Sequence, residues 1–238
     1  MIRVLTTAYN CQDYIERCIN SIKSQVNAEF RCYILDDMST DGTPQRAIKA
    51  IGNDNRFILV TNMDRKHYQP GNYDSVIRHP FHRLNDDDIC VEVDGDDFLP
   101  DPNVFERVLD YYADGKTWIT YGQFRFENGP IGFSREVDIP NIRRSEFTAS
   151  HLRTWVCWLW KKIKVEDLYN GTWYAETAGD TYFMFPMLEM AGKEHSKFVT
   201  DVNYVYNHYN PINDHKVDLG KQRGLAWAAC QKTPYLPL

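Results

Sequence analysis

The stretch Ile89–Asp97, ICVEVDGDD, joins a short run of strand-forming residues to a cluster of carboxylates. Its β-branched and apolar residues favour a buried strand over Ile89–Val93, so that Asp94-Gly95-Asp96-Asp97 must lie where the strand ends. A single acidic turn of this kind is common as a solvated loop or a helix cap. Its meaning therefore depends on which other strand ends lie beside it.

Two earlier strands end in the same way. Ile2–Ala8 (IRVLTTA) leads into Tyr9-Asn10, and Arg31–Leu35 (RCYIL) leads into Asp36-Asp37. Parallel strands present their carboxyl ends at one edge of a sheet, and ligands of open α/β sheets bind there. We therefore expect the polar strand ends to converge on one site.

Helix patterns alternate with these strands. Apolar side chains recur at helical spacing between Tyr14 and Ile22, with Asn10 as a candidate cap, and Thr43-Pro44 is typical of a helix start. Phe57–Thr61 is a further strand. The alternation predicts an α/β fold with a mostly parallel central sheet flanked by helices.

The second half of the chain has a different pattern. Trp118–Phe126 and Ile131–Phe133 flank an Asn-Gly turn, which predicts a β-hairpin. Aromatic residues are dense from Trp155 to Tyr182, and a helical stripe that begins at Trp155 favours a packed core over a sugar-stacking surface. No linker or repeat separates the halves, so we expect one domain with an aromatic-rich second half.

Composition excludes several classes of protein. The 238 residues are 43% hydrophobic, which excludes a disordered chain, and the formal net charge of −6 argues against a nucleic-acid binder. The motifs of P-loop ATP binding, Rossmann NAD binding and serine hydrolases are all missing. No signal peptide or apolar run of about 18 residues is found, so we expect a cytoplasmic protein, of the host cytoplasm if the source is a virus.

The acidic strand ends also predict a metal. Two carboxylate clusters at one sheet edge are costly unless they share a cation or a proton. Oxygen ligands suit Mn²⁺ or Mg²⁺, and Mg²⁺ typically binds one or two carboxylates together with substrate phosphates. For either cluster taken alone, a solvated acidic loop is the alternative.

Three motifs in order resemble the signature of family-2 glycosyltransferases of GT-A fold. They are VLTTAYN at 4–10, ILDDMSTDGT at 34–43 and VDGDD at 93–97. The resemblance runs from residue 1 to about residue 210 and implies a single Rossmann-like nucleotide-diphospho-sugar transferase domain over 1–210. Residues 1–115 would form its nucleotide-binding half and 116–210 its acceptor-side half, followed by a C-terminal helical extension at 211–238.

The resemblance implies a metal-dependent, inverting transfer of a hexosyl group from a nucleotide-diphospho-sugar, usually a UDP-sugar, to an acceptor hydroxyl. Asp37 would accept the ring N–H of uracil, and the DXD-type acidic turn would contact the ribose and the metal. The expected nucleotide contacts are Thr7, Tyr9, Asn10, Asp37 and Asp94. The expected ligands of Mn²⁺ or Mg²⁺ are Asp96, Asp97 and His208.

An inverting displacement needs a general base for the acceptor hydroxyl, and one carboxylate suffices. The family places it late in the chain before an apolar helix, which makes Asp180 the expected base and Glu176 the second choice. Asp180 also fits the N-cap of that helix, and both roles are compatible. Thr148–Thr154 resembles a segment that borders the acceptor cleft. His151 and Arg153 are therefore expected to touch acceptor or phosphate, with a packed surface pair as the alternative.

One segment departs from the family pattern. Many members carry Gly-x-x-x-Ala-Arg-Asn before the acidic strand, whereas Gln69–Asp74 (QPGNYD) has no arginine, so that Arg65 or Lys66 would have to supply the positive charge. Two other functions stay open: a non-catalytic nucleotide- or glycan-binding domain, and a nucleotidyltransferase, which would need basic residues for a triphosphate. The sequence does not name the sugar, the acceptor or the oligomeric state.

Overall fold

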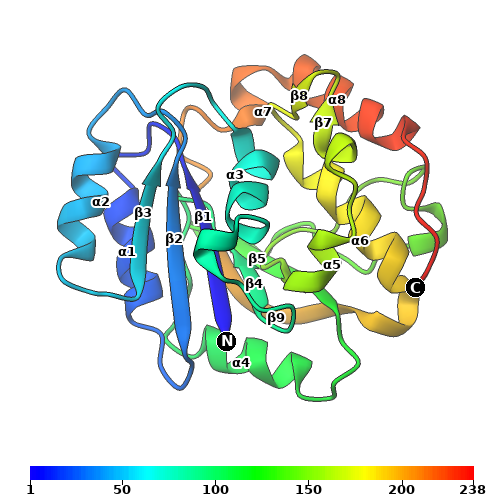
Figure 1. The fold of residues 1–238 in the computed structure, drawn as a ribbon, viewed down its shortest axis with the longest axis horizontal. Coiled ribbons are helices and arrows are strands. Elements are labelled where there is room, and N and C mark those ends of the chain that lie inside the picture. The colour runs from blue at the N-terminus through cyan, green and yellow to red at the C-terminus, as the bar shows by residue number, and fades with distance from the viewer.

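A seven-stranded sheet runs through the computed structural model, which describes residues 1–238 (Figure 1). Its strand order is β3-β2-β1-β4-β6-β5-β9. The strands are β1 (Ile2–Ala8), β2 (Phe30–Asp36), β3 (Phe57–Thr61), β4 (Ile89–Glu92), β5 (Ile119–Phe126), β6 (Thr154–Val156) and β9 (Ser196–Tyr206). Strands β3, β2, β1 and β4 are parallel, β6 is antiparallel to β4 and β5, and β9 is parallel to β5. The predicted α/β fold with a mostly parallel sheet is confirmed.

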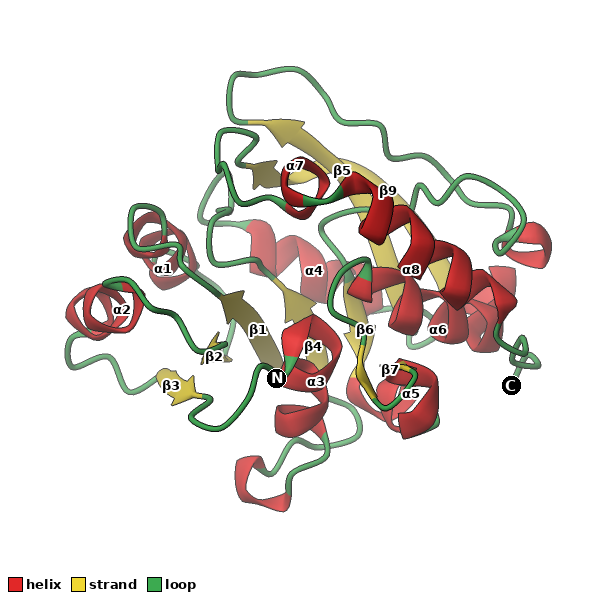
Figure 2. Ribbon diagram, turned by 90° about the horizontal axis from the view of Figure 1, so that it is seen from above, coloured by secondary structure: helices red, strands yellow, loops and turns green.

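Helices cover both faces of this sheet (Figure 2). They are α1 (Ile15–Lys23), α2 (Thr43–Ile51), α3 (Tyr68–Ile77), α4 (Val104–Tyr112), α5 (Cys157–Lys161), α6 (Gly179–His195), α7 (Asp214–Val217) and α8 (Leu219–Gln231). Because successive side chains of a strand point to opposite faces, β1 contributes Ile2 and Val4 to a core shared with α1, α2 and α4. Leu5 points to the other core, which contains residues of α3, α5, α6 and α8.

Some local predictions were wrong because distant contacts overrode local patterns. Asn10 does not cap α1, whose N-cap is Tyr14; its side chain instead accepts a hydrogen bond from Thr40 N at 2.8 Å. Trp155 lies on β6 rather than on a helix, although its predicted place in the core is confirmed. The predicted hairpin is reduced to one bridge between Arg125 and Ile131.

The C-terminal segment packs on the domain. Helix α8 lies against α6 (Figure 1), where Tyr182 donates a hydrogen bond to Leu225 O at 3.1 Å and Arg143 donates one to Ala229 O at 2.6 Å. The division at residue 210 stays a prediction. A short hairpin of β7 (Tyr169–Asn170) and β8 (Trp173–Tyr174) lies beside α3. None of the helices combines the length and the apolar character that crossing a membrane would require.

Candidate active site

A cavity of about 940 Å³ lies at the carboxyl ends of β1 and β4. This volume falls in the range of ligand sites, roughly 300–1,000 Å³. The parallel register brings the strand ends together, since Ala8 pairs with Asp36 and Leu5 with Glu92. All the site residues expected from the sequence line this one cavity: Thr7, Tyr9, Asn10, Asp37, Asp94, Asp96, Asp97, His151, Arg153, Asp180 and His208.

The acidic turn after β4 is held tightly against β1. Gly95 N donates to Thr7 O at 2.8 Å, and a Cβ on Gly95 would lie only 2.9 Å from that carbonyl oxygen, so glycine is required for this close approach. Thr7 Oγ1 also donates to Asp94 Oδ1 at 3.2 Å. Strand β1 and the acidic turn after β4, which lie far apart in the sequence, are thus joined by direct hydrogen bonds.

The carboxylates of this turn are crowded and desolvated. Burial raises the pKa of Asp94 to about 7, with a further contribution from the charge of Asp96. Burial also raises the pKa of Asp96. Asp96 Oδ2 accepts from Asn210 at 2.7 Å, whereas Oδ1 has no hydrogen-bond partner. Like charges held close together at the cavity, with an oxygen left over, fit the binding of a divalent cation.

Asp97 and His208 fit a metal less well than Asp96 does. Both oxygens of Asp97 are already used, since Asn207 N and the Tyr204 hydroxyl each donate to it at 2.7 Å. His208 is exposed, and its ring is stacked with His215 at a centroid distance of 6.0 Å. Their assignment as metal ligands stays a prediction, and the geometry favours Asp96 over both.

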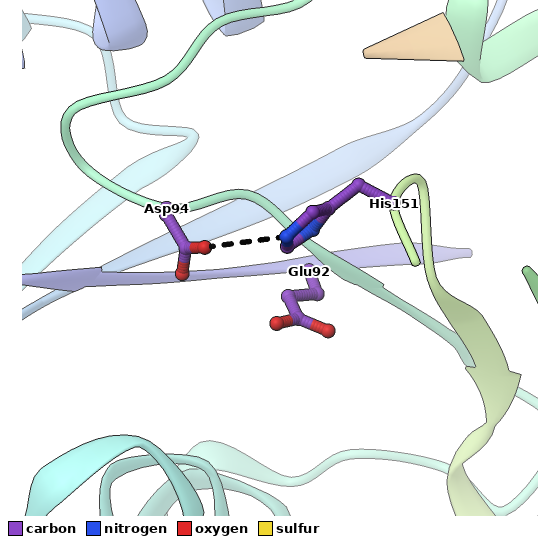
Figure 3. Close-up of side chains that lie close together, drawn as sticks. All are labelled: Glu92, Asp94 and His151. Carbon is purple, nitrogen blue, oxygen red and sulfur yellow. Dashed lines mark ion pairs between the residues drawn. The ribbon is translucent and has the colours of Figure 1, made fainter. Parts of the chain in front are cut away.

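Glu92, Asp94 and His151 lie close together below this turn (Figure 3). Their ligand atoms lie within 4.8 Å of one another, and His151 Nε2 is 3.8 Å from Asp94 Oδ2. The His151 ring stacks on Tyr204 at a centroid distance of 4.3 Å, and burial lowers the pKa of His151 well below its usual value. Glu92 is paired with a guanidinium, so its charge is already balanced without a metal.

That guanidinium belongs to Arg153, which also binds the expected base. Its Nη1 donates to Glu92 Oε1 at 3.0 Å and its Nη2 to Asp180 Oδ2 at 2.6 Å. Arg153 is therefore a buried residue and not part of a surface pair. Asp180 lies in the first turn of α6, whose N-cap is Ala178, so the N-cap prediction for Asp180 was wrong. Glu176, the second choice for the base, pairs with Lys221.

Sequence reasoning missed Glu92. This residue is fully buried at the end of β4; burial raises its pKa, and the Arg153 guanidinium opposes that rise. A carboxylate inside the otherwise apolar run ICVEV was the available signal, because charged residues are almost never fully buried unless they are paired.

Asp37 organises the nucleotide side of the cavity. Its carboxylate accepts from Asn62 Nδ2 at 2.7 Å, from His67 N at 2.7 Å and from Tyr68 N at 2.9 Å. These bonds fix the connection between β3 and α3, a role that local spacing did not predict. The contact of Asp37 with a uracil ring stays a prediction; the lone pairs of its carboxylate that accept no protein hydrogen bond would make it.

The two cations considered for the missing arginine have different positions. Lys66 lines the cavity with its Nζ 3.3 Å above the ring centre of Tyr9, which is 39% exposed. Arg65 instead lies over the ring of Trp173, 4.0 Å from its centre. Lys66 is therefore the cation available to an anionic ligand.

Known structures have the same architecture. TarS 1-349 of S. aureus, in a complex with UDP-GlcNAc, aligns with a TM-score of 0.67 and 17% identity over 90% of this chain and 60% of that one. Glucosyl-3-phosphoglycerate synthase of Mycobacterium tuberculosis, with Mn²⁺, UDP-glucose and phosphoglyceric acid, has a TM-score of 0.67 and 16% identity, covering 97% of this chain and 79% of that one. The fold is that of GT-A glycosyltransferases.

Sequence comparison assigns the chain to one family of glycosyltransferases. The model of glycosyl transferase family 2 matches residues 3–185, and the chain belongs to that family of enzymes. Chondroitin synthase of Pasteurella multocida (strain Pm70) is 25% identical over an alignment of 199 residues that covers 81% of this chain and 19% of the synthase. Hyaluronan synthase of Pasteurella multocida matches to the same extent. The chain thus spans about a fifth of the length of these two relatives.

Proposed function

We propose that this chain transfers a sugar from a UDP-sugar to an acceptor hydroxyl, with a divalent cation and with inversion at the anomeric carbon. The observation that carries the proposal is the convergence of the acidic turn, the nucleotide-side residues and Asp180 on one cavity. The domain over 1–210 would do this work, and the segment 211–238 would complete the cavity wall through Asn213, Asp214 and Gln222.

Asp94 and Asp96 are the residues proposed to face the cation. Both are partly exposed to the cavity, both have raised pKa values, and Asp96 keeps one oxygen without a partner. A bound Mn²⁺ or Mg²⁺ would neutralise the charge that develops on the leaving diphosphate. Solved relatives of the same fold contain Mn²⁺, which supports the choice of ion.

Asp180 is proposed as the general base. It takes the proton of the acceptor hydroxyl, while the hydroxyl oxygen attacks the anomeric carbon from the face opposite to the nucleoside diphosphate. The C–O bond to the diphosphate breaks as the new glycosidic bond forms, and the electron pair leaves with the diphosphate. On the nucleotide side, Tyr9 and Asp37 are proposed to hold the uracil ring of the donor, and Lys66 is proposed to add positive charge.

Nucleotide binding tests the donor site first. Thermal shift and calorimetry with UDP, GDP, CDP and TDP, each in Mn²⁺, Mg²⁺ or EDTA, are expected to show tight binding of UDP with metal only. A ligand at 100 times its Kd adds about 2.7 kcal/mol of stability, which is easily seen. If no nucleotide shifts the unfolding transition under any metal condition, the donor site is wrong.

Turnover tests the reaction itself. UDP-GlcNAc, UDP-glucose and GDP-mannose are offered with and without chondroitin or hyaluronan oligosaccharides, and release of the nucleoside diphosphate is followed. Release that depends on metal and on an acceptor supports the transferase. Tight UDP binding without any release from any donor would instead identify a non-catalytic nucleotide-binding domain.

A further inference from the structure

Arg153 and Glu92 form a buried ionic connection that ends at Asp180. Arg153 donates to Glu92 Oε1 at 3.0 Å and to Asp180 Oδ2 at 2.6 Å. The side chains of Arg153 and Glu92 are 5% and 0% exposed, whereas that of Asp180 is 26% exposed. One end of the connection is therefore closed inside the protein, and the other end opens into the cavity.

Every nitrogen of the Arg153 guanidinium already has a protein acceptor. Besides the two carboxylates, Ala149 O accepts from Nε at 3.0 Å. The planar fork cannot turn toward a ligand without breaking these bonds, and breaking a buried pair is strongly destabilising. Two of the five guanidinium N–H groups have no protein acceptor and Arg153 lines the cavity, so its contact with acceptor or phosphate stays a prediction.

Glu92 is restrained in the same way from the opposite side. Its Oε1 accepts from Arg153 and also from Gln69 Nε2 at 2.7 Å, while Oε2 is buried without a partner. A carboxylate that is fully desolvated and only partly hydrogen-bonded is costly to the fold. Glu92 reaches the site by two routes: through Arg153 to Asp180, and through Gln69, whose Nε2 also donates to Asp94 Oδ1 at 3.4 Å.

We propose that Arg153 and Glu92 are positioning residues that hold the base Asp180 in its working orientation. Arg153 fixes Oδ2 of Asp180, and Thr181 N donates to Oδ1 at 3.0 Å, so the plane of the carboxylate is set. Because Arg153 divides its donors between two carboxylates, Asp180 keeps lone pairs free for an acceptor hydroxyl. This inference rests on the proposed role of Asp180 in the transfer.

The chain contains a matched control for this connection. Arg143 and Glu189 form a two-bonded pair with both side chains 8% exposed, and neither residue lines the cavity. Glu189→Gln therefore removes a buried charge of the same kind without touching the site. It measures what the loss of a buried ion pair does to turnover through stability alone.

The test is a double-mutant cycle on turnover. The kcat for diphosphate release, from the donor that the wild type uses fastest, is measured for Glu92→Gln, Asp180→Asn and the double variant, with UDP·Mn²⁺ affinity followed by calorimetry. Glu92→Gln is expected to lower kcat about tenfold and to leave UDP·Mn²⁺ affinity within about twofold. The double variant is expected to be no slower than Asp180→Asn, since Glu92 acts through Asp180.

The control and the second variant keep the test decisive. Glu189→Gln is expected to lower Tm and to keep kcat within about twofold of the wild type. Arg153→Lys replaces Glu92→Gln in the cycle if the latter does not fold; a lysine keeps the charge but cannot bridge two carboxylates as a fork does.

Two results would overturn the inference while leaving the transferase intact. One is losses from Glu92→Gln and Asp180→Asn that multiply in the double variant. The other is a Glu92→Gln protein that keeps its kcat and loses UDP·Mn²⁺ affinity instead. A wild type that releases no diphosphate from any donor refutes the proposed function, and the inference falls with it.

Discussion

The two walls of the cavity are built by different topologies. On the nucleotide side, β1, β2 and β4 are parallel strands in register, and the residues that follow each strand meet without further help. On the opposite side, Arg153 follows no strand end but precedes the antiparallel β6, and Asp180 lies in the first turn of α6. A parallel sheet thus gathers motifs by its direction alone, whereas the other wall depends on how separate elements pack.

The largest expected effect tests the packed wall. Asp180→Asn should lower kcat by about 10²–10⁴-fold, the usual contribution of a general base, without weakening UDP·Mn²⁺ binding. Diphosphate release and calorimetry measure the two quantities. Glu176→Gln is the comparison variant: Glu176 also lines the cavity, but its exposed carboxylate pairs with Lys221, so kcat should stay within about twofold. A larger loss in Glu176→Gln would move the base to that residue.

The second prediction tests the strand-end wall. Asp96→Asn should weaken binding of UDP with Mn²⁺ by about 10–100-fold, because it removes a charged oxygen ligand from the proposed cation site. Asp97→Asn should instead lower the free energy of unfolding by about 1–3 kcal/mol, since an amide cannot accept from both Tyr204 and Asn207. Calorimetry measures the binding and urea denaturation measures the stability. If Asp97→Asn lost the affinity and Asp96→Asn lost only stability, Asp97 would be the ligand.

The third prediction concerns Asp37, which belongs to a strand-end motif but also holds the connection between β3 and α3. Its substitution therefore tests both ways of building the cavity. In Asp37→Asn, one of the two oxygens that accept from His67 N, Tyr68 N and Asn62 becomes an amide group. The free energy of unfolding should fall by about 1–2 kcal/mol. Affinity for UDP should fall in EDTA as well as in Mn²⁺, because the substitution affects the contact with uracil and not the metal site. A purely metal-dependent loss would contradict this role.

The smallest effect concerns Lys66. Lys66→Met should weaken UDP binding by about threefold at low salt, and the difference from the wild type should shrink at 0.5 M NaCl, about the range where exposed charges are screened. Arg65→Met is the matched control, because Arg65 lies on Trp173. Equal losses in both variants would show that neither cation has a specific place in the site.

Local sequence was sufficient for the features that depend on neighbouring residues. The strands end where polar residues follow apolar ones, and α2 begins at Thr43-Pro44 as expected. Three such motifs in order were enough to indicate the fold and the family, because the convergence of parallel strand ends requires no knowledge of side-chain packing.

Only the tertiary structure decided which polar atoms are free and which are used. Asp96 and Asp97 are adjacent and chemically identical. Tyr204 and Asn207 donate to both oxygens of Asp97, whereas Asn210 donates to only one oxygen of Asp96. Glu92 meets Arg153 across 61 positions of the chain. Hydrogen-bond partners of this kind follow from the packing of distant elements, and residue spacing carries no record of them.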